Sequence, residues 1–279
     1  MEHYSILKGK KIAGKIRISI RKKIKEGPAQ RSPGLAVLIA GSDRASKYYA
    51  GLIQKKGKKD GISVKIENFE STTTGELIKV IEAYNKDKII DGILIQVPLP
   101  DNIDKKKVLN ALSPGKDIDG QTPYNQGKLL TGDKGVYPAT AQAILKILKG
   151  NNIALVGKDV TVVGISNVVG MPASVLLAQA EATVTMCHYR STPLKKYTRN
   201  ADIIVAAAGV PNLIKADYVK KGAVIVDVGT NEVDGEIVGD VDFKKAIKKA
   251  RISPVVGGVG ALTLAYLFKN TYELYRKHI

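Results

Sequence analysis

The chain has few cysteine, histidine and aromatic side chains, and each shortage excludes a class of protein. Its single cysteine, Cys187, excludes a disulfide framework and a cysteine-based metal site. Three histidines in 279 residues are too few for a histidine-rich metal site. Tryptophan is absent and phenylalanine occurs three times against twelve tyrosines, so aliphatic side chains must fill most of the core.

Long apolar runs are also missing. No segment approaches the roughly 20 apolar residues that a membrane-spanning helix needs, and the N-terminus lacks the apolar core of a signal peptide. The sequence therefore predicts a cytoplasmic protein with no membrane partner.

Acidic residues are the scarcer charged class, because 26 Asp and Glu stand against 44 Lys and Arg and leave a net charge of +18. The basic residues are scattered over segments such as 55–59, 105–107 and 244–249. Aromatic residues that could stack on bases do not alternate with them. We interpret the lysines as solvated helix faces and predict no nucleic-acid partner. The positive field still favours anionic ligands.

The chain is longer than one domain usually is, so two domains are expected. Strand and helix patterns alternate along it, which indicates parallel sheets and an α/β fold. In the first half we predict strands over 34–40, 62–69 and 92–97, and helices over 6–25, 46–59 (stopped by Gly61) and 74–85.

The segment 114–137 is rich in Gly, Pro, Asp and Asn, and we predict an extended connection between the domains there. A second series of elements follows it. We predict helices over 140–148 and 261–277 and strands over 160–163, 183–187, 203–207 and 224–228.

A candidate nucleotide site follows the strand 160–163. The chain runs into Gly164, where a tight turn needs no Cβ, and a helix is expected to begin near Pro172. The N-terminus of a helix suits a pyrophosphate because its backbone N–H groups are free. The spacing from Gly164 through Ser166 to Gly170 departs from G-x-G-x-x-G, so an ordinary glycine-rich turn is the alternative.

The end of the next strand bears on the choice of nucleotide. NAD-specific folds usually place an acidic residue there to bind the ribose 2′-hydroxyl. Here residues 188–192 contain no carboxylate but include Arg190 and Ser191, which suit a 2′-phosphate. We therefore predict NADP as the cofactor, the alternative being that Arg190 points into solvent.

Four co-linear segments resemble those of the methylenetetrahydrofolate dehydrogenase/cyclohydrolase family. They are Asp91–Pro100 (DGILIQVPLP), Lys116–Gly120 (KDIDG), Gly164–Gly170 and Ser253–Gly260. The resemblance runs from about Leu7 to Asn270, nearly the whole chain.

This resemblance implies a two-domain α/β fold. The folate-binding domain would comprise residues 1–120 and about 262–279, because the C-terminal helix returns to it. A Rossmann-type parallel-sheet domain, about 121–261, would bind NADP. The implied reaction oxidises 5,10-methylenetetrahydrofolate to the methenyl cation, which many members then hydrolyse to 10-formyltetrahydrofolate. The implied partners are tetrahydrofolate one-carbon derivatives and a second copy of the chain in a homodimer.

The resemblance also assigns site residues. Tyr49, Gln96 and Asp119 match the family's residues at the one-carbon centre and pterin ring, and the glycines Gly257 and Gly258 would let backbone approach the substrate. The cofactor residues would be Gly164, Ile165, Ser166, Val169, Gly170, Tyr189, Arg190, Ser191 and Thr230.

One departure affects the second activity. The catalytic lysine of cyclohydrolase chemistry lies four residues after the tyrosine in the family, and Ile53 occupies that position here. An isoleucine cannot move protons, so we expect the cyclohydrolase step to be weak or absent. Lys56, on the same predicted helix, is the candidate substitute. Smaller departures are Val256, Ala139, Ala141, Ile165 and Tyr189, which replace residues that are common in the family.

Two alternatives remain open at this stage. A fully bifunctional enzyme would use Lys56 or a water chain in place of the missing lysine. A non-catalytic basic binding protein would have kept the fold and would use its charge for nucleic acid.

Overall fold

The computed structural model describes residues 6–27 and 31–279, which form two compact α/β units. Unit 1 comprises residues 1–14 and 140–263, and unit 2 comprises residues 15–139 and 264–279. Helices α1 (Gly9–Glu26) and α10 (Val259–His278) begin in unit 1 and continue into unit 2. The division into folate and cofactor domains at residues 120 and 262 stays a prediction.

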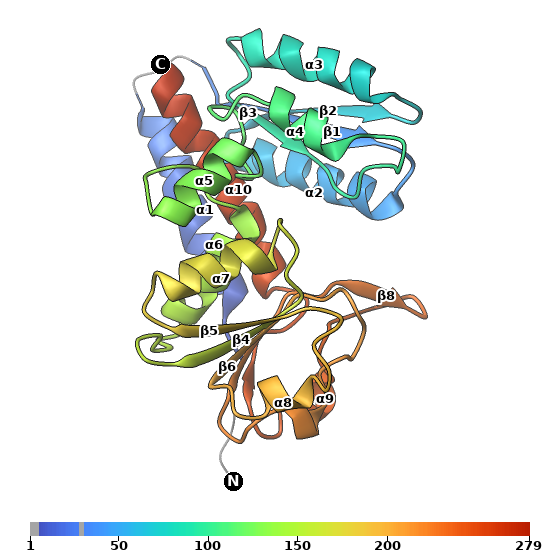
Figure 1. Cartoon of the computed structure of the whole chain (residues 1–279). Helices are drawn as coiled ribbons and strands as arrows, with labels where there is room; N and C mark the ends of the chain where they lie inside the picture. The colour runs from blue at the N-terminus through green and yellow to red at the C-terminus, as the bar shows by residue number, and fades with distance from the viewer. Residues whose placement is uncertain (1–5, 28–30) are drawn as a thin grey trace. The chain divides into compact units, whose positions relative to one another are not determined.

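Unit 2 is built on a parallel sheet of three strands in the order β2-β1-β3 (Figure 1). The strands are β1 (Gly34–Ala40), β2 (Ser63–Phe69) and β3 (Gly92–Ile95). The central strand β1 is buried along its whole length, and alternate residues face opposite sides of the sheet. Leu35, Val37 and Ile39 belong to one core, and Ala36, Leu38 and Ala40 to another. Both faces must therefore be covered by helices.

The two faces receive different helices. Helix α2 (Arg44–Asp60) contributes Ala50 and Ile53 to the first core, together with residues of α1 and α10. Helices α3 (Thr74–Lys86) and α4 (Lys105–Ala111) cover the other face and contribute Leu77 and Val108. In Figure 1 α2 and α3 lie on opposite sides of the sheet.

Local signals in the sequence fix the ends of these helices. The Asp43 carboxylate accepts a hydrogen bond from the Ser46 backbone N–H at the start of α2, and Gly61, with a φ of 83°, ends that helix. The side chains of Thr73 and Glu76 form a capping box at the start of α3. The predicted strand 34–40 and the predicted stop at Gly61 are confirmed.

The prediction of an extended connection over 114–137 is wrong. Helix α5 (Pro123–Thr131) lies inside it, with Thr122 as N-cap, Pro123 in the first turn and Gly132 as a left-handed C-cap. The Pro and Gly residues that suggested a loop are the two ends of a short helix. Helix α6 (Ala139–Gly150) follows.

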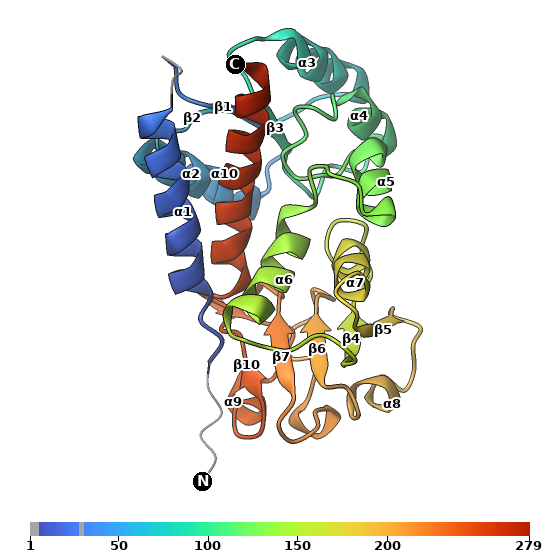
Figure 2. The same cartoon turned by 90° about the vertical axis from the view of Figure 1, so that its left-hand side faces the viewer.

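Unit 1 is built on a parallel sheet of five strands in the order β10-β7-β6-β4-β5 (Figure 2). The strands are β4 (Asp159–Val163), β5 (Thr183–Cys187), β6 (Ile203–Ala206), β7 (Val224–Asp227) and β10 (Arg251–Ile252). Because the second strand in the sequence lies outside the first and the third lies on the other side, the strand order reverses between β4 and β6. In open α/β sheets, ligands bind at the carboxyl ends of the strands beside this switch point.

The remaining elements connect these strands. Helix α7 (Gly170–Ala178), predicted to begin near Pro172, begins two residues earlier and packs on β4 and β5. The others are α8 (Lys195–Thr198), the 3₁₀ turn η1 (Ala216–Tyr218), the antiparallel hairpin of β8 (Asn231–Val233) and β9 (Glu236–Val238), and α9 (Phe243–Ala246).

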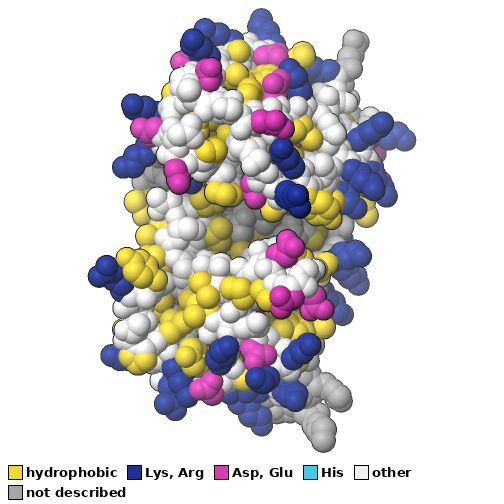
Figure 3. All heavy atoms as spheres, turned by 90° about the vertical axis from the view of Figure 1, so that its right-hand side faces the viewer, with side chains coloured by type: hydrophobic (Ala, Val, Ile, Leu, Met, Phe, Trp, Pro, Cys, Tyr) yellow, Lys and Arg dark blue, Asp and Glu magenta, His cyan; other side chains and the backbone are white. Residues whose placement is uncertain are grey.

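The surface carries the charge that the composition predicts. On the face in Figure 3, Lys and Arg side chains are spread widely, with Asp and Glu among them. Among the helices of residues 6–27 and 31–279, none is both long and apolar enough to cross a bilayer.

Candidate substrate and cofactor sites

The three predicted substrate residues of unit 2 all follow segments of its sheet, at the carboxyl ends of the strands. Helix α2, which carries Tyr49, follows β1, and Gln96 directly follows β3. The segment with Asp119 runs parallel to β3, because Ile93 forms a bridge with Asp117. Since β1 and β3 are adjacent and parallel, their carboxyl ends meet where the strand order reverses, which is where a ligand is expected.

Asp119 is a mostly buried carboxylate with two donors. Its Oδ2 accepts a hydrogen bond from Nε2 of Gln121 at 2.6 Å, and its Oδ1 accepts one from the backbone N–H of Ala139 at 3.2 Å. Burial raises the pKa of Asp119 to about 6, although these two hydrogen bonds act against the increase. An ionised carboxylate can accept about four hydrogen bonds, so acceptor capacity remains for a ligand.

Tyr49 lies close enough to Asp119 to respond to its charge. Burial, and then the negative charge of Asp119, raise the pKa of the Tyr49 hydroxyl far above its ordinary value. The hydroxyl therefore stays protonated at physiological pH. It can donate or accept a hydrogen bond but cannot act as a base there.

Gln96 has a buried polar atom with no partner in the described part of the chain. The residue is 8% exposed and its Nε2 donates no hydrogen bond, while its backbone N–H donates to the Leu38 carbonyl at 2.9 Å. A buried donor left unpaired costs about 1–3 kcal/mol. Such an atom, beside the end of β3, is suited to a ligand acceptor.

The other polar residues of the segment 116–120 shape it. Nζ of Lys116 donates to the carbonyls of Tyr84 and Asp87 at the C-terminus of α3, at 2.7 and 2.6 Å. The Asp117 carboxylate accepts from the backbone N–H groups of Gln121 and Thr122 and so turns the chain toward α5. Lys116 and Asp117 therefore fix the segment through hydrogen bonds within the protein, whereas Asp119 keeps acceptor capacity for a ligand.

The two donors that orient Asp119, Gln121 and Ala139, were not predicted from the sequence. Gln121 stands one residue beyond the recognised segment, and Ala139 acts through its backbone N–H, which carries no sequence signal. The only sequence signal for Gln121 was that it is a polar residue two positions after the predicted binding residue Asp119.

The replacement at position 53 is a core residue. Ile53 is fully buried and packs in the core beneath β1, on the buried stripe of α2 formed by Ser46, Ala50, Ile53, Gly57 and Asp60. Lys56 is half-buried, on the flank of this stripe. It lies seven residues after Tyr49, or roughly 10 Å along the helix axis.

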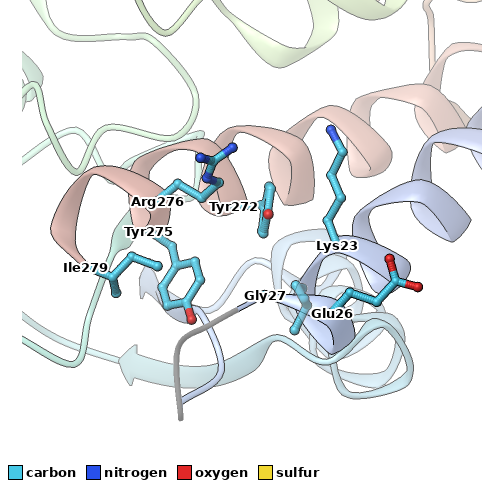
Figure 4. Close-up of a pocket in the computed structure, with 8 residues that line it drawn as sticks. Lys23, Glu26, Gly27, Tyr272, Tyr275, Arg276 and Ile279 are labelled. Carbon is cyan, nitrogen blue, oxygen red and sulfur yellow. The ribbon is translucent and has the colours of Figure 1, made fainter.

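A separate cavity of unit 2 lies away from these residues. Its volume is about 660 Å³, and it opens between the C-terminal turns of α1 and α10, lined by side chains such as Lys23, Tyr272 and Arg276 (Figure 4). Tyr49, Gln96 and Asp119 are not part of its lining. We therefore locate the candidate site at the carboxyl ends of β1 and β3.

In unit 1, the loop after β4 has the geometry of a nucleotide cradle. Gly164 has a φ of 91°, and a Cβ there would lie 2.2 Å from the Ala207 carbonyl oxygen. A Cβ on Gly170 would lie 1.8 Å from the Gly164 carbonyl oxygen. Both positions therefore require glycine. Val169, the N-cap of α7, forms no side-chain cap, which suits the binding of an anion at the start of that helix.

The other loop residues border this cradle. Ser166 is exposed and Ile165 is half-exposed, and the Ser166 hydroxyl and carbonyl accept hydrogen bonds from the Val169 backbone N–H. The predicted Thr230 is exposed and follows β7 at the same edge of the sheet.

The residues after β5 offer a cation. Arg190 is exposed, its Nε donates to the Tyr189 hydroxyl at 3.1 Å, and its guanidinium lies 5.4 Å from the centre of the Tyr189 ring. The Ser191 hydroxyl accepts from the His188 backbone N–H. In the described part of the chain no carboxylate pairs with Arg190, so the guanidinium can bind a phosphate.

The predicted substrate glycines Gly257 and Gly258 lie in unit 1, after β10. Gly257 has a φ of 85°, and a Cβ on Gly258 would lie 2.0 Å from the Pro254 carbonyl oxygen. The other predicted substrate residues, Tyr49, Gln96 and Asp119, lie in unit 2.

Two family models match the chain. The tetrahydrofolate dehydrogenase/cyclohydrolase catalytic domain matches residues 7–119, and the NAD(P)-binding domain of the same enzymes matches residues 138–279. The chain belongs to the tetrahydrofolate dehydrogenase/cyclohydrolase family.

Relatives in this family match the whole chain. The bifunctional protein FolD of Halothermothrix orenii is 46% identical over 278 residues, 98% of each chain. The bifunctional FolD of Campylobacter jejuni is similar in structure, with a TM-score of 0.95, 39% identity and 99% of each chain covered. The FolD of Trypanosoma brucei, solved with NADP and an inhibitor, gives a TM-score of 0.94 at 33% identity, again over 99% of each chain. The predicted family and the two-domain α/β fold with a Rossmann-type, NADP-binding domain are confirmed.

Proposed function

We propose that the protein oxidises 5,10-methylenetetrahydrofolate to 5,10-methenyltetrahydrofolate with NADP. The observation that carries this proposal is the group of Asp119, Tyr49 and Gln96 at the sheet edge of unit 2, in a chain of the tetrahydrofolate dehydrogenase/cyclohydrolase family. The NADP-bound relative from Trypanosoma brucei and the glycine cradle after β4 support the choice of cofactor.

The proposed roles follow from the chemistry of each group. Asp119, already oriented by Gln121 and Ala139, accepts hydrogen bonds from the amino group of the pterin ring. The unpaired Nε2 of Gln96 donates to the substrate. The protonated hydroxyl of Tyr49 bonds beside the one-carbon centre.

The reaction requires alignment more than acid–base chemistry. A methylene between two nitrogens becomes a delocalised cation when it loses hydride, so no strong base is needed. NADP, when bound, supplies the hydride acceptor. The protein contributes orientation, because a fixed substrate needs no further loss of motion to react.

We propose further that the cyclohydrolase activity is weak or absent. Ile53 has neither charge nor proton, and its side chain lies in the core. Lys56 stands two helical turns from Tyr49, a separation of roughly 10 Å that a flexible side chain spans poorly. Losing a positioned acid–base group typically lowers a rate by about 10²–10⁴-fold.

A paired assay of the two half-reactions tests both proposals. With 5,10-methylenetetrahydrofolate and NADP, we expect NADPH to form and methenyltetrahydrofolate to accumulate, seen by its near-ultraviolet absorbance. Absence of NADPH would refute the dehydrogenase proposal. Added methenyltetrahydrofolate should disappear at the rate of buffer alone, and a faster loss that Lys56→Met abolishes would establish the fully bifunctional alternative.

The substitution Ile53→Lys tests the explanation for the missing activity. We expect it to raise the hydrolysis of methenyltetrahydrofolate by at least roughly 10-fold over buffer, because it returns an acid–base group one turn from Tyr49. Burying a lysine in the core should also lower the melting temperature. Ile53→Met, which fills similar volume without a charge, is the matched control and should leave hydrolysis unchanged. Equal rates for both variants would contradict the explanation.

We also propose, from the family resemblance, that the active form is a homodimer. Light scattering on purified protein should give twice the 30.0 kDa chain mass, and a mass of one chain would refute it. A cytoplasmic location stays a prediction of the sequence.

A further inference from the structure

Two buried carboxylates of unit 1 have no part in the reaction described above. Asp227 is the last residue of β7 and is 2% exposed, and Asp240 follows β9 and is fully buried. Buried carboxylates are costly unless they are well hydrogen-bonded, so their partners are informative.

Asp240 connects two loops at the carboxyl edge of the sheet. Its Oδ2 accepts hydrogen bonds from the backbone N–H groups of Ala208 and Gly209, in the loop after β6, at 2.6 and 2.9 Å. Its Oδ1 accepts a hydrogen bond from Nδ2 of Asn231, after β7, at 3.0 Å. One side chain thus holds both loops at a fixed separation.

Asp227 holds the backbone on both sides of Asp240 by hydrogen bonds. Its Oδ1 accepts from the backbone N–H groups of Gly229 and Asp240, both at 3.0 Å, and its Oδ2 accepts from that of Val241 at 3.2 Å. Burial raises the pKa of Asp227 to about 6, and the charge of Asp240 acts in the same direction, so the carboxylate is ionised at neutral pH.

The backbone packs tightly against the carboxylates of Asp227 and Asp240. A Cβ on Gly229 would lie 2.2 Å from Oδ1 of Asp240, and a Cβ on Gly239 would lie 1.9 Å from Oδ2 of Asp227. The backbone therefore closes directly onto both carboxylates.

The held loops border the candidate cofactor site. Thr230 stands between Gly229, which Asp227 holds, and Asn231, which Asp240 holds. The loop held at Ala208 begins with Ala207, whose carbonyl oxygen is the close neighbour of Gly164. Since β4 and β6 flank the switch point of the sheet, Asp240 acts on the loop that faces the glycine cradle.

We propose that Asp240, supported by Asp227, is a positioning residue for the cofactor, because it fixes the spacing of the loops after β6 and β7 on which NADP rests. This inference depends on the proposed NADP-dependent function. It predicts that loosening Asp240 weakens NADP binding and leaves folate binding unchanged, because none of the predicted substrate residues belongs to the loops after β6 and β7.

The test compares Asp240→Ala, Asp240→Asn and Asn231→Ala with wild type. Titration calorimetry gives the Kd for NADP, and steady-state kinetics give the KM of each substrate and kcat. We expect Asp240→Ala to raise the Kd for NADP at least roughly 10-fold, because hydrogen bonds to a charged group are the stronger class. Asn231→Ala should raise it by a few-fold, and Asp240→Asn should recover much of the loss, because an amide oxygen still accepts from Ala208 and Gly209. The folate KM should stay within twofold of wild type.

Asp242 supplies the matched control. It lies two residues from Asp240, and its side chain caps α9 by accepting from the Lys245 backbone N–H instead of bonding to Ala208, Gly209 or Asn231. Asp242→Ala should leave the Kd for NADP unchanged. In nitrogen-15 NMR spectra, Asp240→Ala should shift the amide signals of Ala208, Gly209 and Thr230 strongly, whereas Asp242→Ala should not move them.

Each outcome separates the inference from the proposed function. If wild type binds neither NADP nor NAD, the proposed function fails and the inference fails with it. If wild type binds NADP and Asp240→Ala and Asn231→Ala bind it within twofold of wild type, the inference alone is overturned. Should Asp240→Ala not fold, as judged by circular dichroism, the half-exposed Asn231 decides the question through Asn231→Ala.

Discussion

At the scale of single residues, Asp119 is a carboxylate whose burial lowers the stability of the folded protein when it is ionised. It lies mostly buried between Gln121 and Ala139, and its pKa of about 6 is well above the ordinary 3.8. Between pH 3.8 and about 6, Asp119 is therefore protonated in the folded protein and ionised in the unfolded chain, so folding takes up a proton. Above about pH 6 the carboxylate is ionised, which suits hydrogen bonds from a pterin and disfavours the folded state.

The first prediction follows from this pKa. In wild type, kcat/KM for the folate substrate should rise with pH through about 6 as Asp119 ionises. Asp119→Asn should remove this limb and lower kcat/KM by roughly 10²-fold, since a charged acceptor is lost. The same substitution should raise the free energy of unfolding at about pH 7.5 by roughly 1–2 kcal/mol, a gain that shrinks as the pH approaches 4.

The measurements are pH–rate profiles and urea denaturation at both pH values. Asp133→Asn, at an exposed aspartate of the same unit, is the control and should change neither. An unaltered acid limb in Asp119→Asn would show that another group titrates.

At the scale of elements, α10 holds the Asp119 loop. Nδ2 of its Asn270, 2% exposed, donates to the carbonyls of Ile118 at 2.8 Å and Tyr137 at 3.3 Å. These carbonyls belong to the two segments that supply Asp119 and its donor Ala139. The segments also touch directly, because a Cβ on Gly120 would lie 2.6 Å from the Val136 carbonyl oxygen.

The second prediction concerns this clasp. Asn270→Ala should raise the KM for the folate substrate by roughly 10-fold, because the carbonyls of Ile118 and Tyr137 lose a donor and the loop loosens. Asn270→Asp should be worse, since it places a carboxylate against carbonyl oxygens. The KM for NADP should not change in either variant.

Thr271→Val is the matched control. Within residues 6–27 and 31–279 the Thr271 hydroxyl bonds only to the Leu267 carbonyl of its own helix, at 2.8 Å, and valine keeps its shape. Both folate KM and the pH profile should remain those of wild type. A control that raises the folate KM as much as Asn270→Ala would mean that any disturbance of α10 suffices.

Some helices and strands of this fold could be predicted from the sequence and others could not. The strand 34–40 and the helix stop at Gly61 follow from aliphatic runs and a glycine, which are local signals, and they were predicted correctly. Helix α5 was missed because its cap residues Pro123 and Gly132 are also loop residues. The contact between Asn270 and Ile118 joins residues 152 positions apart, and no local pattern encodes such a contact.

The candidate site divides in the same way. Tyr49, Gln96 and Asp119 came from a family resemblance, and the topology explains why they fall at one edge of a parallel sheet. Asn270 and Asp240 were not predicted, because they bond to backbone groups of distant segments, and Gln121 was not predicted, because it lies just outside the recognised segment and bonds to the Asp119 side chain. Residues that bind a ligand can be recognised from a sequence motif. Residues that hold the binding loop are recognised only in the structure, as buried polar side chains.

At the scale of the whole molecule, the net charge of +18 bears on how ligands arrive. The lysines are scattered along the sequence and are spread over the face in Figure 3, which favours a diffuse positive field over a specific anion site. Such a field raises the rate at which anions encounter the protein, and salt screens it over about 10 Å at 0.1 M. Because NADP carries a 2′-phosphate that NAD lacks, the two cofactors differ in charge and serve as a matched pair.

The third prediction uses this pair. Raising the salt from about 20 mM to about 300 mM should lower kcat/KM for NADP by roughly 3- to 10-fold and that for NAD by less, with kcat nearly unchanged. We expect part of the difference to come from Arg190, because its guanidinium is exposed and can pair with a phosphate. Arg190→Ala should therefore reduce the salt dependence for NADP toward that for NAD without changing NAD itself. If both cofactors respond equally to salt in wild type, the charge of this protein serves solubility alone, and the preference for NADP must come from uncharged contacts.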